Sequence, residues 1–271
     1  MKQPYSYFDP ANSTSNFEVD IRQAWYDYQG MSKKYGQYCP VALATEILGE
    51  RWTILIILVF CDGVTRFSDM QRALPRIPAS TLAQRLRSLE AARIIRKRTR
   101  DGAQEYRLTD AGEDLAPIIY EMAYWGQRWA RDLEVEDLDP LHLVWSVHLR
   151  INTDAMPTGR TTIQIEFTDL PQKQKYYWLV VNDDVVDVCI KHPGYEPDVK
   201  VACGIQRFVD AWRGFRSMEK EVRAGRIKVS APPVLKKAFP NWLLLSGAAH
   251  IERQAPGRER TLQRRTRASA S

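Results

Sequence analysis

Apolar residues recur at helical spacing in two short stretches that a proline-rich break separates. Ser68 and Gln71 have the spacing of a capping box, which predicts a first short helix beginning at Ser68. Residues 75–78 end this helix, because a proline disfavours helical geometry in the residue before it. A second helix is predicted from about Ser80, with one apolar face and one polar face. Its apolar face holds Leu82, Leu86 and Leu89, and its polar face holds Ser80, Thr81, Gln84, Arg85 and Ser88.

Two β-strands are predicted directly after this helix, at residues 94–99 and 105–108. Asp101 and Gly102 join them, and an Asp-Gly pair accepts the positive φ angles of a tight hairpin turn. Between Arg76 and Arg107 there are nine arginines and lysines but three acidic residues, a surplus equal to the +6 of the whole chain. A helix, a turn, a helix and a basic hairpin predict a winged helix-turn-helix that binds duplex DNA.

Three further helices are predicted around this unit, at residues 41–48, at residues 52–60 and from Thr109 onward. The second of them is too short to cross a membrane, which takes about 20 residues. We expect its residues Trp52, Leu55, Ile56 and Val59 to form the centre of the core.

The helix from Thr109 has more apolar surface than a small domain can bury. Its apolar stripe consists of Leu115, Ile118, Ile119, Met122, Trp125 and Trp129. This stripe packs either on a second domain or on a second copy of the chain. We favour a homodimer, because two-fold symmetry sets two recognition helices about 34–36 Å apart, one turn of DNA.

Motifs spread through this region resemble, in order, those of the HxlR family of winged-helix regulators. They are Cys39-Pro40-Val41, Gly49-Glu50-Arg51-Trp52-Thr53, Arg66-Phe67-Ser68, Leu74-Pro75, Thr81-Leu82-x-x-Arg85-Leu86-x-x-Leu89-Glu90, Tyr106-x-Leu108-Thr109-x-x-Gly112 and Trp125-Gly126-x-x-Trp129. The resemblance covers residues 36–131 and implies a dimeric DNA-binding domain whose first and last helices form the dimer contact. The chain departs from the family at residues 76–78, where Gly-Ile-Ser is common, and at Arg93, where glycine is common.

The polar face of the second helix and the first strand of the hairpin supply the expected DNA contacts. Arg85 can form two hydrogen bonds with guanine, and Gln84 can form two with adenine. Ser80 is placed to bind a phosphate at the start of the helix. We therefore predict that DNA is bound by Ser80, Thr81, Gln84, Arg85, Ser88, Lys97, Arg98 and Arg100.

A second domain is predicted at residues 144–252, after an acidic linker at residues 132–143. Residues 162–167 alternate between apolar and polar, which predicts a strand with one wet face. Residues 176–181 have no polar face and predict an interior strand. Shorter strands and three amphipathic helices follow, so the expected fold is an α+β sheet with helices on one face.

This second region resembles the sterol-carrier-protein-type domain, in which a sheet and helices enclose an apolar tunnel. The residues that carry the resemblance are Gln164-Ile165-Glu166-Phe167, Tyr177-Trp178-Leu179-Val180-Val181, Trp212-x-Gly214, Ala224-Gly225-Arg226-Ile227-x-Val229 and Trp242-Leu243-Leu244-Leu245-Ser246. The resemblance implies a pocket for a small hydrophobic effector, although the same aromatic residues could simply fill a core. The expected pocket residues are Trp178, Phe208, Trp212, Phe239 and Trp242.

The chain has four cysteines, and neither their spacing nor that of the histidines matches a metal site. We therefore expect no metal and no cofactor, and a cytoplasmic, reducing location. Cys39 precedes a helix that begins at Pro40, where the helix dipole favours a thiolate. Some members of the resembled family sense oxidants or electrophiles through this cysteine; the alternative is a quiet, partly buried thiol.

The two ends of the chain differ in composition from the domains. Residues 1–35 are expected to be a variable extension, with translation starting at Met1 or at Met31. Residues 253–271 are basic and are expected to be a disordered tail.

The sequence contains no catalytic motif, so we do not expect an enzyme. It also contains no apolar stretch long enough to span a membrane, so we do not expect a membrane protein. The function predicted is a homodimeric, DNA-binding transcriptional regulator with an effector-binding second domain. The alternative is a module that binds or transfers lipid, in which the winged helix serves only for protein contacts. The nine basic residues of the helix-and-hairpin region favour the regulator, because a protein-contact domain does not need them.

Overall fold

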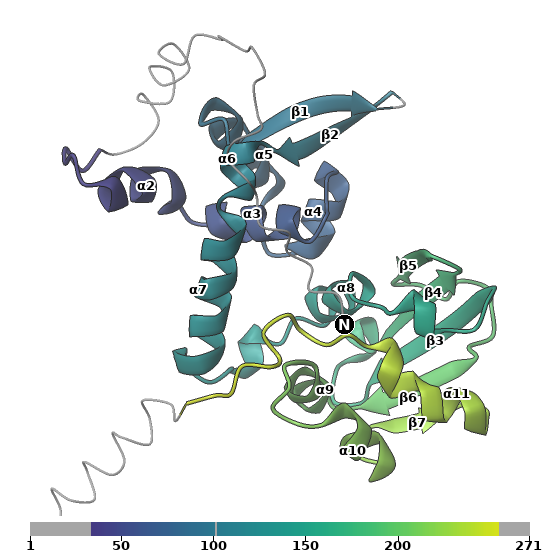
Figure 1. Ribbon diagram of the computed structural model, residues 1–271. Coiled ribbons are helices and arrows are strands. Elements are labelled where there is room, and N and C mark those ends of the chain that lie inside the picture. The colour runs from purple at the N-terminus through teal and green to yellow at the C-terminus, as the bar shows by residue number, and fades with distance from the viewer. Residues whose placement is uncertain (1–33, 101, 255–271) are drawn as a thin grey trace, which may run out of the picture.

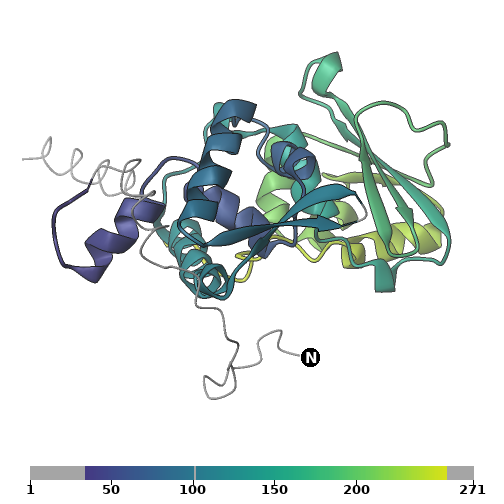
Figure 2. The ribbon, with the colours of Figure 1, turned by 90° about the horizontal axis from the view of Figure 1, so that it is seen from above.

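The computed structural model describes residues 34–100 and 102–254. Most of the expected N-terminal extension, Asp101 of the hairpin turn and nearly all of the expected basic tail lie outside the described residues. The chain forms two domains, and Figures 1 and 2 show the first (purple to teal) beside the second (green to yellow). Within the described ranges, no helix is long and apolar enough to cross a membrane.

The first domain is a winged helix-turn-helix, as predicted. Its helices are α2 (Pro40–Leu48), α3 (Thr53–Cys61), α4 (Phe67–Ala73), α5 (Ala79–Ala91), α6 (Asp110–Glu113) and α7 (Ala116–Trp129). Strands β1 (Ile95–Arg100) and β2 (Ala103–Leu108) pair antiparallel and form the wing (Figure 1). Gly102, in the turn between them, has the positive φ of 76° that the hairpin requires.

The core of the first domain lies between α3, α4, α5 and the wing. The three leucines of α5 are buried as predicted, because they recur on one face of the helix. Ile56 and Val59 are also buried. The expectation for Leu55 is wrong: this side chain is exposed, since α3 is apolar on all sides and only part of its surface faces the core.

Two predicted helix boundaries are corrected by the structure. Helix α4 begins at Phe67, one residue before the expected Ser68, and Ser68 Oγ donates to the neighbouring Asp69 instead of capping the helix. The long helix expected from Thr109 is divided into α6 and α7. Thr109 caps α6, accepting a hydrogen bond from the Gly112 N–H. Pro117 lies in the first turn of α7, where its missing N–H is tolerated.

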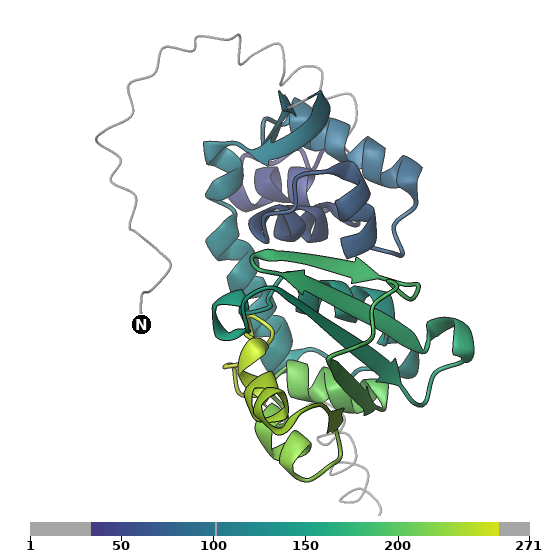
Figure 3. The same cartoon turned by 90° about the vertical axis from the view of Figure 1, so that its right-hand side faces the viewer.

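The second domain contains a five-stranded mixed sheet with the order β5-β4-β3-β6-β7 (Figure 3). The strands are β3 (Arg160–Phe167), β4 (Tyr176–Asn182), β5 (Val185–Cys189), β6 (Val199–Cys203) and β7 (Lys228–Ser230). Strands β3 and β6 run parallel, and the other neighbours are antiparallel. The interior position predicted for residues 176–181 is confirmed, because β4 pairs with β3 and β5.

Helices cover one face of this sheet. They are α9 (Ile205–Trp212), α10 (Met218–Arg223) and α11 (Pro233–Ala238), followed by the 3-10 helix η4 (Phe239–Trp242). Alternate residues of β3, such as Ile163 and Ile165, point into the core, which also contains Phe208 and Trp242. The α+β arrangement expected from the alternation of apolar residues is therefore confirmed.

Helix α8 (Pro140–His148) lies between the two domains (Figure 1). Leu143, Val144 and Val147 on this helix pack in the core of the second domain. Trp145, from another side of the same helix, packs in the core of the first. The segment expected to be an acidic linker therefore includes the start of a helix that both domains share.

Candidate nucleic-acid interface

Helix α5 presents a polar face to solvent because its leucines occupy the opposite face. Ser80 and Gln84 are exposed, and Thr81, Arg85 and Ser88 are partly exposed. The residue before the helix, Pro78, has no side chain that could cap it. The N–H groups of the first turn are therefore suited to donate hydrogen bonds to a phosphate oxygen, as expected for the position of Ser80.

The wing places its basic residues beside this helix. All residues of β1 after Ile95 are exposed, including Lys97, Arg98 and Arg100. Lys97 Nζ lies 3.1 Å from Glu90 Oε2 near the end of α5. This ion pair joins the first strand of the wing to the last turns of α5, so the basic strand lies next to the C-terminal end of that helix.

A buried carboxylate stabilises the base of the wing. Glu105 on β2 is 7 % exposed, and its oxygens lie 3.6 Å from Arg66 Nε and 3.4 Å from Arg107 Nη2. The adjacent Tyr106 N–H donates to the Thr65 carbonyl at 2.8 Å. Arg66 was not among the site residues expected from the sequence. The ion pair had no local signal, because Glu105 and Tyr106 are consecutive buried residues and break the usual alternation of exposure along a strand.

Arg85 differs from the other predicted base-contacting residues. Its Nη2 donates to Glu50 Oε2 at 2.8 Å, and its side chain is 17 % exposed. In this conformation the guanidinium is paired within the protein. Arg85 can contact DNA only by exchanging Glu50 for a base or a phosphate.

The structure also explains one departure from the resembled family. Arg93, at a position where glycine is common, has a φ of 57°, a conformation that glycine adopts without strain. Its carbonyl oxygen accepts a hydrogen bond from Thr109 Oγ1 at 2.5 Å. The left-handed turn between α5 and β1 is thus preserved in this chain despite the side chain.

The second departure, at Arg76, lies in the turn between α4 and α5. Arg76 Nε lies 3.5 Å from Asp139 Oδ2, and Nη2 donates to the Glu136 carbonyl. Both partners belong to the acidic segment between the domains. Residue 76 therefore connects the turn of the helix-turn-helix to the segment between the two domains.

The comparisons with known proteins agree with this architecture. A family model described as HxlR-like helix-turn-helix matches residues 47–134. The HTH-type transcriptional regulator YvaP of Bacillus subtilis is 35% identical over 97 residues, which cover 34% of this chain and 90% of YvaP. The chain belongs to the HxlR family.

Other relatives of this HxlR-family chain include the HTH-type transcriptional regulator Rv3095 of Mycobacterium tuberculosis. It is 39% identical over 92 residues, covering 33% of this chain and 58% of Rv3095. Among solved structures, the redox regulator HypR in its reduced form is 32% identical, covering 33% of this chain and 91% of HypR, with a TM-score of 0.32. The reduced form of YodB from Bacillus subtilis is 34% identical, covering 34% of this chain and 93% of YodB, with a TM-score of 0.31.

The HxlR domain leaves a large apolar surface uncovered. Trp125 on α7 is 62 % exposed. The other exposed apolar residues of α2, α3 and α7 are Val41, Leu43, Leu55, Ile118, Met122 and Trp129. Helix α2 buries no residue of its own, and Figure 2 shows it on the side of the first domain remote from the second. The second domain therefore does not cover this surface.

Cys39 of the HxlR motif is the residue before α2 and is partly exposed. Of the three other cysteines, Cys203 is buried, and Cys61 and Cys189 are partly exposed like Cys39. Burial and Asp62 raise the pKa of Cys61, burial and Asp187 raise that of Cys189, and burial raises the pKa of Cys203 to about 12. These three thiols are therefore protonated at neutral pH and poorly nucleophilic.

The aromatic residues expected to line an effector pocket are all buried. Phe208, Trp212, Phe239 and Trp242 belong to the core of the second domain. Trp242 is 0 % exposed, and its Nε1 donates to the Ala155 carbonyl at 3.0 Å. Trp178 lies on the other face of the sheet, where its ring contacts His192 edge-on with centroids 5.6 Å apart. These side chains pack against protein atoms, and the pocket described below is lined by other residues.

Proposed function

We propose that this chain is a sequence-specific, DNA-binding transcriptional regulator. One observation carries the proposal: the polar face of α5 and the basic strand β1 are both exposed, and the Lys97–Glu90 ion pair joins the strand to the helix. In this proposal α5 enters the major groove and the wing contacts the backbone. The contacting residues are Ser80, Thr81, Gln84, Arg85, Ser88, Lys97, Arg98 and Arg100.

We further propose that the chain acts as a homodimer through α2 and α7. The exposed apolar side chains of these helices support the proposal, because exposed apolar patches of this kind mark protein interfaces. A two-fold axis beside α7 would present two recognition helices to two half-sites. Such a dimer doubles the number of phosphate contacts and hence the dependence of binding on salt.

The second domain is proposed to regulate DNA binding, and its fold to be of the sterol-carrier-protein type. A five-stranded sheet with helices on one face supports the fold, and the contacts of α8 with α4 support the coupling. An effector would act by favouring one arrangement of the two domains, typically by about 1–3 kcal/mol. We also propose that reaction of the Cys39 thiol with oxidants or electrophiles regulates DNA binding. The partial exposure of this thiol at the start of α2 supports the proposal.

Titration of the purified protein on the DNA upstream of its own gene tests the proposal. The control is a scrambled duplex of the same composition, at about 150 mM salt. We expect at least ~10³-fold tighter binding to the upstream fragment. Failure to bind any duplex, even at low salt, would contradict the proposal and favour a lipid-binding module.

A further inference from the structure

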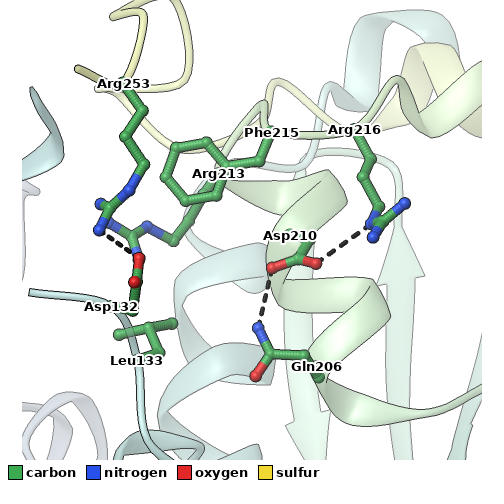
Figure 4. A pocket seen from close by; sticks show the side chains of 8 residues that line it. All are labelled: Asp132, Leu133, Gln206, Asp210, Arg213, Phe215, Arg216 and Arg253. Atoms are coloured by element: carbon green, nitrogen blue, oxygen red, sulfur yellow. Dashed lines mark hydrogen bonds and ion pairs between the residues drawn. The ribbon is translucent and has the colours of Figure 1, made fainter. Parts of the chain in front are cut away.

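A pocket of about 480 Å³ lies where the C-terminal end of α7, the segment that follows it and the second domain meet. Its volume is within the range typical of small-molecule sites. Its lining is Asp132, Leu133, Gln206, Asp210, Arg213, Phe215, Arg216 and Arg253 (Figure 4). The chain's last described residues return to α7 here, since the Gln254 N–H donates to the Arg128 carbonyl at 3.0 Å (Figure 1).

Arg213 is the least compensated charge in this pocket. Its Nε and Nη2 donate to Gln127 Oε1 at 3.1 and 2.8 Å, so its partner is a neutral amide. Within residues 34–100 and 102–254, no carboxylate forms an ion pair with it. Burial and the charge of Arg253 lower its pKa, because both disfavour the guanidinium. An anion next to Arg213 would relieve this cost.

The other charged lining residues pair with one another, so Arg213 leaves the pocket lining with a surplus of one positive charge. Arg253 pairs with Asp132, and Arg216 Nε lies 3.1 Å from Asp210 Oδ2. Three arginines thus stand against two aspartates in the pocket lining. This surplus matches a monoanion better than a dianion.

Phe215 and Leu133 supply apolar surface for the rest of such a ligand. The Phe215 ring lies beneath two cations, with Arg213 Cζ at 4.7 Å and Arg253 Cζ at 5.6 Å from its centroid. The loop is held in place at Gly214, whose φ is 79° and where a Cβ atom would lie 2.2 Å from the Ala249 carbonyl oxygen. The arginines are therefore presented on a fixed loop around an aromatic ring.

We propose that this pocket binds a small organic monoanion, an aromatic carboxylate, with its carboxylate on Arg213 and its ring against Phe215 and Leu133. A guanidinium can bind a carboxylate through two parallel hydrogen bonds between opposite charges. The present partner of Arg213, the Gln127 amide, is neutral and offers no such charge. The role of this ligand as an effector rests on the proposed function; its binding does not.

The location of the pocket connects the ligand with the dimer helix. Gln127, 4 % exposed on α7, accepts from Arg213 and donates through Nε2 to the Arg213 carbonyl at 2.8 Å. A carboxylate on Arg213 competes with the Gln127 side chain for the same guanidinium. Binding of the ligand therefore changes the contact between the C-terminal end of α7 and the second domain. Through α7, it also changes the spacing of the two recognition helices in a dimer.

Calorimetric titration of the full-length protein with 2-naphthoate tests the site, with 2-naphthamide as the neutral isostere. We expect the carboxylate to bind at least ~10-fold more tightly than the amide, since a charge-assisted hydrogen bond is roughly twice as strong as one between neutral groups. Equal binding of both compounds, or no binding of naphthoate at about 10 mM, would overturn the proposal.

Three variants localise the binding. Arg213→Gln and Arg253→Gln, whose guanidinium groups lie side by side over Phe215 (Figure 4), should each weaken naphthoate binding at least ~10-fold, with thermal unfolding confirming that each folds. Arg223→Gln is the matched control, because Arg223 pairs with Glu219 on the exposed side of α10 and does not line the pocket. Unchanged binding in both pocket variants would overturn the site.

A parallel DNA titration separates the two proposals. Naphthoate binding with a change of about 5-fold or more in DNA affinity supports the effector role. Naphthoate binding with unchanged DNA affinity leaves the site standing and overturns its regulatory role. Naphthoate binding by a protein that binds no duplex would overturn the proposed function but not the site.

Discussion

The Nδ1 atom of His142 lies 2.8 Å from the carbonyl oxygen of Ala73, the last residue of α4. The carbonyl groups of the last turn of a helix lack partners within that helix, and His142 from α8 supplies one here. Arg72 on α4 also lies over the Trp145 ring, 5.9 Å from its centroid. The second domain therefore contacts the helix that precedes the recognition helix.

We expect Trp145→Ala to uncouple the two domains. Trp145 is 6 % exposed and packs in the first core, so truncation should cost about 3–5 kcal/mol of unfolding free energy. Urea unfolding followed by fluorescence should then separate into two transitions. Leu244→Ala is the control, because Leu244 is exposed. A single transition with an unchanged midpoint would show that α8 does not couple the domains.

Replacing Trp125 on α7 by glutamate should convert a dimer into a monomer. A charge at the centre of an apolar interface is desolvated without a partner and disfavours association. Sedimentation velocity at micromolar concentrations measures the change. Val185→Glu, at an exposed valine of the second domain, is the control and should leave association unaltered. A wild-type chain that sediments as a monomer would contradict the dimer directly.

Glu50→Gln should increase affinity for DNA. The substitution removes the carboxylate that holds Arg85, so the guanidinium becomes available to phosphates or bases. We expect a several-fold gain on any duplex, measured by fluorescence anisotropy. Glu46→Gln on α2 serves for comparison. Reduced affinity in Glu50→Gln would mean that the pair with Glu50 orients Arg85 for binding.

Acid should destabilise the second domain through Glu221. Hydrogen bonds from Arg226 and Arg207 lower the pKa of this carboxyl from 4.5 to about 2. A carboxyl whose folded pKa is depressed stabilises the fold fully above its ordinary pKa, and that contribution is lost as pH falls toward the folded value.

The measurement is the unfolding midpoint between about pH 5 and pH 2. Glu221→Gln should flatten the fall of stability in this window, while Glu219→Gln, at an exposed position of the same helix, should not. An equally steep fall in Glu221→Gln would assign the acid sensitivity to other carboxyls.

Local patterns were sufficient for most of the elements. The leucine spacing of α5 and the alternation in β3 depend on nearest neighbours along the chain, and both predicted the buried face correctly. The Asp-Gly pair likewise located the hairpin. These features carry the DNA-binding surface, which is why its residues could be proposed from sequence.

Contacts between distant residues could not be predicted in this way. Glu50 and Arg85 are 35 positions apart, and nothing in the sequence around either residue indicates that they pair. Gln127 and Arg213 meet across 86 positions, so the pocket had no local signature. Aromatic side chains such as Phe239 were expected at a pocket because apolar composition does not distinguish a filled core from an open one.

In the proposed complex, α5 contacts the bases while the wing contacts the DNA backbone. The most direct test compares the affinities of wild type, Gln84→Ala and Arg98→Ala for a bound upstream fragment and for scrambled DNA. Gln84→Ala should lose about 1–3 kcal/mol on the upstream fragment alone, and Arg98→Ala should weaken both duplexes alike and reduce the salt dependence. A wild-type protein that binds the two duplexes equally, or a Gln84→Ala variant that keeps full discrimination, would contradict the account.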